Sequence, residues 1–106
     1  MKRLILATAL ISACAVSPAA KFDQAHLAYN HIASVALSYA ERPDADPVAK
    51  EAISQTVMRT APVILRASTI IDDPEAQESE RTLYVRWALA IVEQATLQLT
   101  DLVLGR

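Results

Sequence analysis

Two Asp-Pro dipeptides, Asp46-Pro47 and Asp73-Pro74, divide this chain and set the strongest limit on its fold. Aspartate directly before proline is typical of a helix start, because the carboxylate accepts hydrogen bonds from exposed backbone N–H groups. Proline in the first turn loses no intrahelical hydrogen bond. We therefore interpret Asp46 and Asp73 as helix N-caps, and the two starts predict three helices joined by short turns.

Apolar side chains recur every three or four residues in each of the three segments, which is the spacing of one helix face. The predicted helices cover about residues 20–42, 47–71 and 74–104. The second contains Pro62, which predicts a kink or a short break near Thr60 because proline lacks an N–H. The expected core residues of the first two helices are Phe22, Ala25, Tyr29, Ile32, Ala36 and Tyr39, followed by Ile53, Val57, Ala61, Ile64, Ser68 and Ile71.

The third predicted helix is apolar around much of its circumference, with one stripe through Tyr84 and Ala88 and a second through Val85 and Leu89. Such a helix normally packs against more than one neighbour. We expect it to contact both other helices and to keep apolar surface for a partner or a second copy. Its aromatic residues, including Trp87, are expected to anchor the core, whereas its polar first two turns should project into solvent.

The composition agrees with an all-α fold, since the chain of 106 residues has a single glycine and is 53% apolar. We predict a small up-down-up three-helix bundle. The expected organisation is a signal peptide at residues 1–13, a tether at 14–19 and the bundle at 20–106.

The amino terminus has the anatomy of a secretory signal peptide. Lys2 and Arg3 precede an apolar run at residues 4–13, and small residues follow. As a helix, residues 4–16 would reach about 20 Å, whereas the hydrocarbon core of a bilayer is roughly 30 Å thick. Pro18 then limits extension, so a spanning anchor is disfavoured.

The run ends in Ile11-Ser12-Ala13-Cys14, which resembles the lipobox of bacterial lipoproteins: an aliphatic residue and two small residues before a cysteine. The resemblance covers residues 1–14 only. It implies that a diacylglycerol is attached to the Cys14 sulfur, that the signal is cut before Cys14, and that the new amino terminus is acylated. Two or more acyl chains hold a protein stably on a bilayer, at about 0.8 kcal/mol for each buried methylene. Ala15 after the cysteine implies an outer-membrane location facing the periplasm.

Two alternatives to lipidation stay open. In the first, the signal is cut after Ala15 or after Ala19, and Cys14 is only a small apolar residue of a leader that is removed. In the second, the leader is kept as a terminal helix.

Other chemistry finds little support. The formal charge of −2 becomes −4 when the positive charges of Lys2 and Arg3 are left out, and nucleic-acid binders need a clustered basic face. His26 and His31 are five positions apart and point to different sides of a helix, so they do not form a metal pair. We expect no metal, no cofactor and no enzymatic activity; a pocket joining either histidine to an acidic residue would change that expectation.

The leading hypothesis is an exported lipoprotein, anchored through Cys14, that acts by contact with an envelope protein. The chain is similar in size to small lipoproteins encoded by phages and prophages. The alternative hypothesis is an unlipidated periplasmic binding or inhibitor module that uses a groove beside the third helix.

Overall fold

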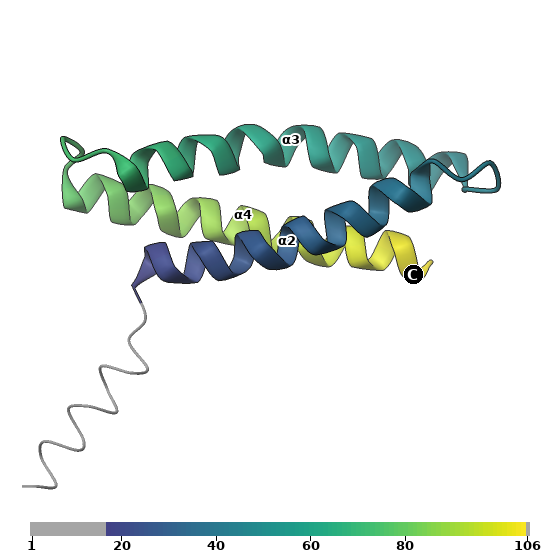
Figure 1. The fold of residues 1–106 in the computed structure, drawn as a ribbon, viewed down its shortest axis with the longest axis horizontal. Helices are drawn as coiled ribbons and strands as arrows, with labels where there is room; N and C mark the ends of the chain where they lie inside the picture. The colour runs from purple at the N-terminus through teal and green to yellow at the C-terminus, as the bar shows by residue number, and fades with distance from the viewer. Residues whose placement is uncertain (1–16, 106) are drawn as a thin grey trace, which may run out of the picture.

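The computed structural model describes residues 17–105, and within that range every regular element is a helix. The chain runs up, down and up again (Figure 1), so consecutive helices are antiparallel. The predicted all-α three-helix bundle is confirmed. The helices are α2 (Pro18–Ala40), α3 (Pro47–Asp72) and α4 (Glu78–Leu104).

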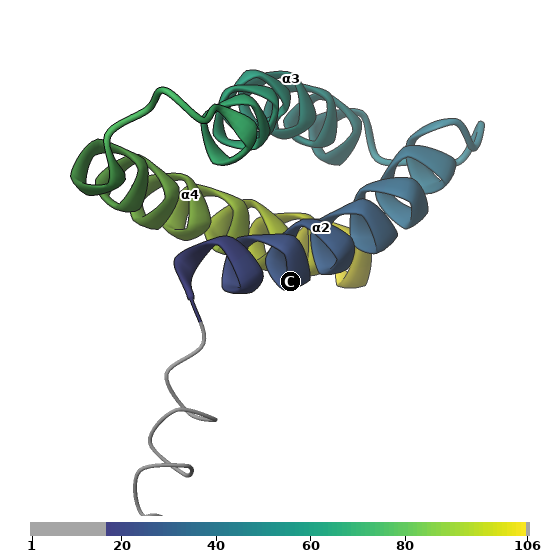
Figure 2. The same cartoon turned by 60° about the vertical axis from the view of Figure 1, so that its left-hand side comes forward.

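Helix α4 is the centre of the bundle. It packs along both α2 and α3, whereas α2 and α3 touch each other much less. Two views of the ribbon show α2 running beside α4, with its carboxyl end turning towards the start of α3 (Figures 1 and 2). The double apolar stripe of the third segment therefore predicted its position between two neighbours.

Helices α2 and α3 both begin with a capping side chain followed by proline. Asp46 accepts a hydrogen bond from the Ala49 N–H at 3.2 Å, as the Asp-Pro order predicts. Ser17 caps α2 in the same way, accepting from the Ala20 N–H at 3.2 Å, and Pro18 is the first helical residue. The sequence interpretation placed Pro18 in the tether; it belongs instead to the bundle, because proline is well suited to a first helical position.

Asp73 is not the N-cap of the third helix, so that prediction is wrong. The residue is the C-cap of α3, and α4 begins later, at Glu78, after Gln77. The Asp73 carboxylate accepts a hydrogen bond from the Glu75 N–H at 2.9 Å, which forms a local turn in place of a helix start.

Arg81 explains how this turn is held. Its guanidinium donates to the backbone carbonyls of Ile70 at 3.3 Å, Asp73 at 2.5 Å and Ala76 at 3.2 Å. Carbonyls at the end of a helix have no intrahelical donor, so a cation placed there supplies one. The prediction that the first turns of this helix project into solvent is wrong for Arg81, which is partly buried against the turn.

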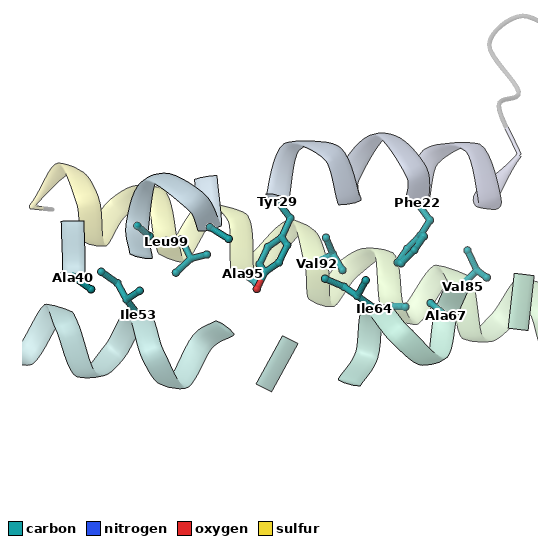
Figure 3. Close-up of a cluster of buried hydrophobic side chains, with 13 residues drawn as sticks. Phe22, Tyr29, Ala40, Ile53, Ile64, Ala67, Val85, Val92, Ala95 and Leu99 are labelled. Atoms are coloured by element: carbon teal, nitrogen blue, oxygen red, sulfur yellow. The ribbon is translucent and has the colours of Figure 1, made fainter. Parts of the chain in front are cut away.

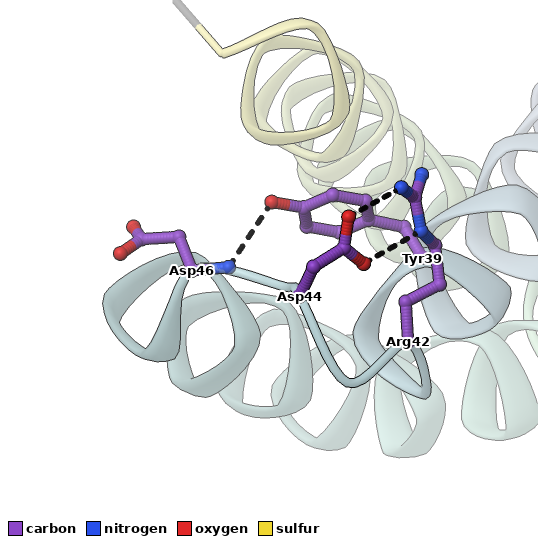
Figure 4. Close-up of polar contacts among 4 residues, drawn as sticks. All are labelled: Tyr39, Arg42, Asp44 and Asp46. Atoms are coloured by element: carbon purple, nitrogen blue, oxygen red, sulfur yellow. Dashed lines mark hydrogen bonds and ion pairs between the residues drawn. The ribbon is translucent and has the colours of Figure 1, made fainter.

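The turn between α2 and α3 is held by a different set of polar contacts (Figure 4). The Arg42 guanidinium forms an ion pair with Asp44 at 2.7 Å, and its hydrogen bonds hold the pKa of that carboxyl below its usual range. The Asp46 N–H donates to the Tyr39 hydroxyl at 3.3 Å. Tyr39 thus links the end of α2 to the start of α3.

The core is a row of small and medium side chains between the helices (Figure 3). On α3 the buried row passes through Thr56 and Thr60, and Ala61, expected in the core, is exposed. Each threonine hydroxyl donates to the carbonyl one turn earlier, at 2.8 and 2.6 Å, so it is buried without losing a partner. The helix continues through Pro62 without the break considered from the sequence. The buried apolar cluster comprises Phe22, Tyr29, Ala33, Ala36, Ala40, Ile53, Ile64, Ala67, Val85, Ala88, Val92, Ala95 and Leu99.

Tyr29 carries the one unusual polar group of this core. Its hydroxyl points from α2 towards α3 (Figure 3) and has no hydrogen-bond partner. The Thr60 hydroxyl donates its own proton to the Thr56 carbonyl, and it is the polar group that acts on the Tyr29 phenol. Burial raises the pKa of the Tyr29 phenol above its usual value of 10.0, and Thr60 offsets part of the increase.

We expect Tyr29→Phe to leave the free energy of unfolding unchanged or to raise it by about 1 kcal/mol, because the change removes a buried, unpaired hydroxyl. The matched control, Tyr39→Phe, removes a hydroxyl that accepts a hydrogen bond and should lower the free energy by about 0.5–1 kcal/mol. Urea unfolding followed by far-ultraviolet circular dichroism measures both. A large loss in Tyr29→Phe would show that the hydroxyl has a stabilising partner.

The raised pKa of Tyr29 also predicts that the free energy of unfolding depends on pH. Because the pKa of Tyr29 is raised in the folded state, the folded protein binds more protons than the unfolded chain above about pH 10. The contribution of the neutral phenol is therefore complete below that pH and declines as pH rises. Unfolding free energies measured between about pH 8 and pH 11, a range that spans the ordinary tyrosine pKa, should fall more steeply for the wild type than for Tyr29→Phe.

Candidate interaction surface

Cys14, which is predicted to carry the lipid, lies outside the described residues, as do the other lipobox residues, Ile11, Ser12 and Ala13. Their role remains the prediction made from the sequence. The candidate site that the structure does describe is a surface of the bundle.

One side of α4 faces away from the core and is rich in apolar side chains. Its large members are clearly accessible, with exposed fractions of 68% for Leu83, 51% for Trp87, 68% for Leu97 and 57% for Leu104. The buried stripe of α4, through Val85, Ala88, Val92, Ala95 and Leu99, lies on the opposite side. We name the exposed side the α4 outer face; its residues are Leu83, Arg86, Trp87, Ala90, Glu93, Gln94, Leu97, Asp101 and Leu104.

Trp87 was expected in the core, and this prediction is wrong. Its neighbours in sequence, Val85 and Ala88, take the core positions, so Trp87 is rotated to the surface. Its ring lies 5.3 Å from the Tyr84 ring at an interplanar angle of 58°. Tyr84 is partly buried, and the Arg66 guanidinium of α3 lies 5.5 Å from its ring centre. The indole is therefore supported at one edge and open at the other.

The middle of the α4 outer face is hollowed. Ala90 has a short side chain between longer neighbours, and a surface depression of about 600 Å³ lies around it. Both signs of charge border this depression. It is lined by Arg86, Leu89, Ala90, Glu93, Gln94, Leu97, Gln98 and Asp101.

A second depression, of about 380 Å³, lies between α3 and α4. Arg59, Gln94 and Gln98 give it polar walls, and the two core threonines form part of its floor. It corresponds to the groove beside the third helix that was proposed from the sequence. The lining residues are Thr56, Arg59, Thr60, Val63, Ile91, Gln94, Ala95 and Gln98.

Exposed apolar residues also occur on α3, where Met58 and Leu65 are each 71% exposed. Val48, near the start of α3, is 77% exposed, and α2 exposes Leu27, Val35 and Leu37. The α4 outer face extends almost from one end of its helix to the other and includes a tryptophan, the residue type most enriched at binding hot spots. We therefore take the α4 outer face as the candidate site.

The remaining candidates for chemistry are separate from one another. His26 lies beside the Phe22 ring, with the ring centres 5.9 Å apart, and His31 is exposed. Among residues 17–105, no three histidine, cysteine or acidic side chains come together as metal ligands would. Over the same residues, no helix has an apolar stretch of the length that membrane crossing requires.

Comparisons with family models, with curated proteins and with solved structures gave no match to this chain. The assignment of a function therefore depends on the surface and the sequence pattern.

Leu97 and Leu99 provide a matched test of the two sides of α4, because they are two residues apart and differ only in burial: 68% and 0% exposed. We expect Leu99→Ala to lower the free energy of unfolding by about 2–5 kcal/mol, as buried leucines do. Leu97→Ala should change it by less than about 0.5 kcal/mol. Chemical unfolding at low protein concentration measures both values. A large loss for Leu97→Ala would mean that this side supports the bundle itself.

Proposed function

We propose that the protein is a small helical lipoprotein of the cell envelope, anchored through Cys14 and acting by protein contact through the α4 outer face. The observation that carries the contact function is the exposure of Trp87 together with three leucines on one side of α4. The lipid anchor is supported by the lipobox resemblance at residues 11–14.

The composition of the α4 outer face supports contact with protein. Interface centres are enriched in aromatic residues and arginine, and surrounding polar groups set orientation. Trp87 and Arg86 are adjacent on this face, and Glu93 and Asp101 provide the opposite charge. Large apolar side chains concentrated on one face typically mark a binding surface.

The early start of α2 supports anchoring close to the membrane. Cys14 is followed by only Ala15 and Val16 before Ser17 caps the helix. At about 3.5 Å for each residue of an extended chain, a connection of this length can span at most about 10 Å. A lipid on Cys14 would therefore hold the bundle at the bilayer surface. This arrangement suits a protein that presents a surface to a neighbour in the envelope.

The groove between α3 and α4 favours a second candidate function, an unlipidated periplasmic binding or inhibitor module. Its polar and apolar walls suit a small ligand or an extended peptide. Under this alternative Cys14 is removed with the leader, so the two functions differ in the chemistry of the mature amino terminus.

We expect the wild-type protein, expressed in a bacterial host, to incorporate labelled palmitate and to begin at a modified Cys14. Cys14→Ser should abolish the label, because the thiol that carries the diacylglycerol is lost. Ala15→Ser is the matched control, since it changes a small neighbour and keeps the thiol; it should be labelled like the wild type. Mass spectrometry of the intact purified proteins and fractionation of the cells give the measurements. An unmodified Cys14 sulfur, or a mature chain that begins after Ala15 or Ala19, would overturn the anchor and favour the alternative.

A further inference from the structure

Four of the five apolar residues of the α4 outer face, all except Trp87, follow a heptad spacing. Leu83, Ala90, Leu97 and Leu104 occur at every seventh position and are all exposed. The residues that α4 buries against α2 and α3 lie on the opposite side of the helix, while Glu93 and Leu97 border α2 near Ala25 and Ala28. A repeat of seven on an exposed side of a helix is the pattern by which one helix packs along another. We name these four residues of the described chain, Leu83, Ala90, Leu97 and Leu104, the seam.

The residues of the seam are placed symmetrically about the middle of α4. Leu83 is at one end and Leu104 at the other, and Ala90 and Leu97 are equally far from the midpoint between residues 93 and 94. Two of the three charges of this face follow the same symmetry with opposite signs: Arg86 lies three positions inside Leu83, and Asp101 lies three positions inside Leu104. The third, Glu93, lies beside the midpoint, opposite Gln94.

We propose that the α4 outer face binds the same face of a second copy of this chain, with the two α4 helices antiparallel and centred between residues 93 and 94. This inference rests on the proposed contact function and names its partner. In this register Leu83 faces the partner's Leu104, and Ala90 faces the partner's Leu97. Arg86 faces the partner's Asp101, and the twofold axis repeats each pair.

The hollow around Ala90 fits this arrangement. The depression of about 600 Å³ is centred on residues that lie next to the twofold axis, and Ala90 leaves space where a longer side chain would project. The partner's Leu97 is 68% exposed in the single chain and would enter that space. A small residue opposite a large one allows the two helices to approach closely.

The charges favour the antiparallel orientation over the parallel one. In the antiparallel register each Arg86 meets a carboxylate, whereas in a parallel pair in register it meets another Arg86. Asp101 also takes part in an interaction within its own chain. A carboxylate has two oxygens and about four acceptor sites, so that interaction and a contact from the partner's Arg86 are compatible.

The test is a charge exchange in the full chain, purified in detergent from the membrane or as the soluble form, whichever the cells produce. Wild type, Arg86→Asp and Asp101→Arg are each measured by sedimentation velocity over a range of concentrations, and the two variants are also mixed in equal amounts. Each variant alone places like charges together twice in the dimer. The mixture restores two opposite-charge pairs.

We expect the wild type to dimerise and each variant alone to dimerise at least about tenfold more weakly, the change that two altered pairs at about 1 kcal/mol each can produce. The mixture should recover the wild-type affinity.

Leu97→Glu places a charge in the seam and should abolish the dimer, while Leu65→Glu on the exposed side of α3 is the matched control and should leave it intact. Far-ultraviolet circular dichroism checks that every variant is folded. A monomeric wild type, or a dimer that is insensitive to Leu97→Glu, overturns the proposal. So does a mixture that associates no better than its components.

Failure of this inference can be separated from failure of the proposed function. A photoreactive amino acid at position 94 should cross-link two copies of the chain in intact cells. A cross-link from this position to a different envelope protein, with a monomeric wild type, overturns self-pairing and keeps the contact function. The absence of any cross-linked product overturns both.

Discussion

The bundle depends on the buried stripe of α4. Val85, Val92 and Leu99 are almost completely buried, and they lie between α2 on one side and α3 on the other. Because α2 and α3 touch each other little, each is held mainly through α4. A protein of this size has only a modest core, and α4 supplies three of its five largest fully buried side chains. The outer face of the same helix is then left without a neighbour.

Most of the core could be inferred from periodicity alone, because burial follows helix geometry. Phe22, Tyr29 and Ile53 were expected in the core and are buried there. Thr60 was not expected, since a hydroxyl is counted as polar in any apolar pattern. Its hydrogen bond to the carbonyl one turn earlier removes the cost of burying the hydroxyl. Thr60 lies at the helical spacing of the buried row through Ala49, Ile53 and Thr56.

The helix boundaries show what a local signal can and cannot predict. Asp46 and Asp73 both precede proline, yet only Asp46 caps a helix. The difference lies eight residues beyond Asp73, in Arg81, whose guanidinium binds the carbonyls at the end of α3 and holds the chain in a turn. No rule based on a dipeptide includes such a contact. Trp87 shows the same limit for the candidate site: its size predicts burial, whereas its angular position on α4 determines exposure.

Under the proposed lipid anchor at Cys14, the start of α2 at Pro18 determines how the protein would search for its partners. A bundle held within about 10 Å of a lipidated residue diffuses in two dimensions, so its encounters are restricted to molecules on the same leaflet. Confinement of this kind raises the effective concentration of neighbouring copies far above their average in the compartment. A weak affinity between outer faces would then be sufficient for association at the membrane, and the same chains would separate once released from it.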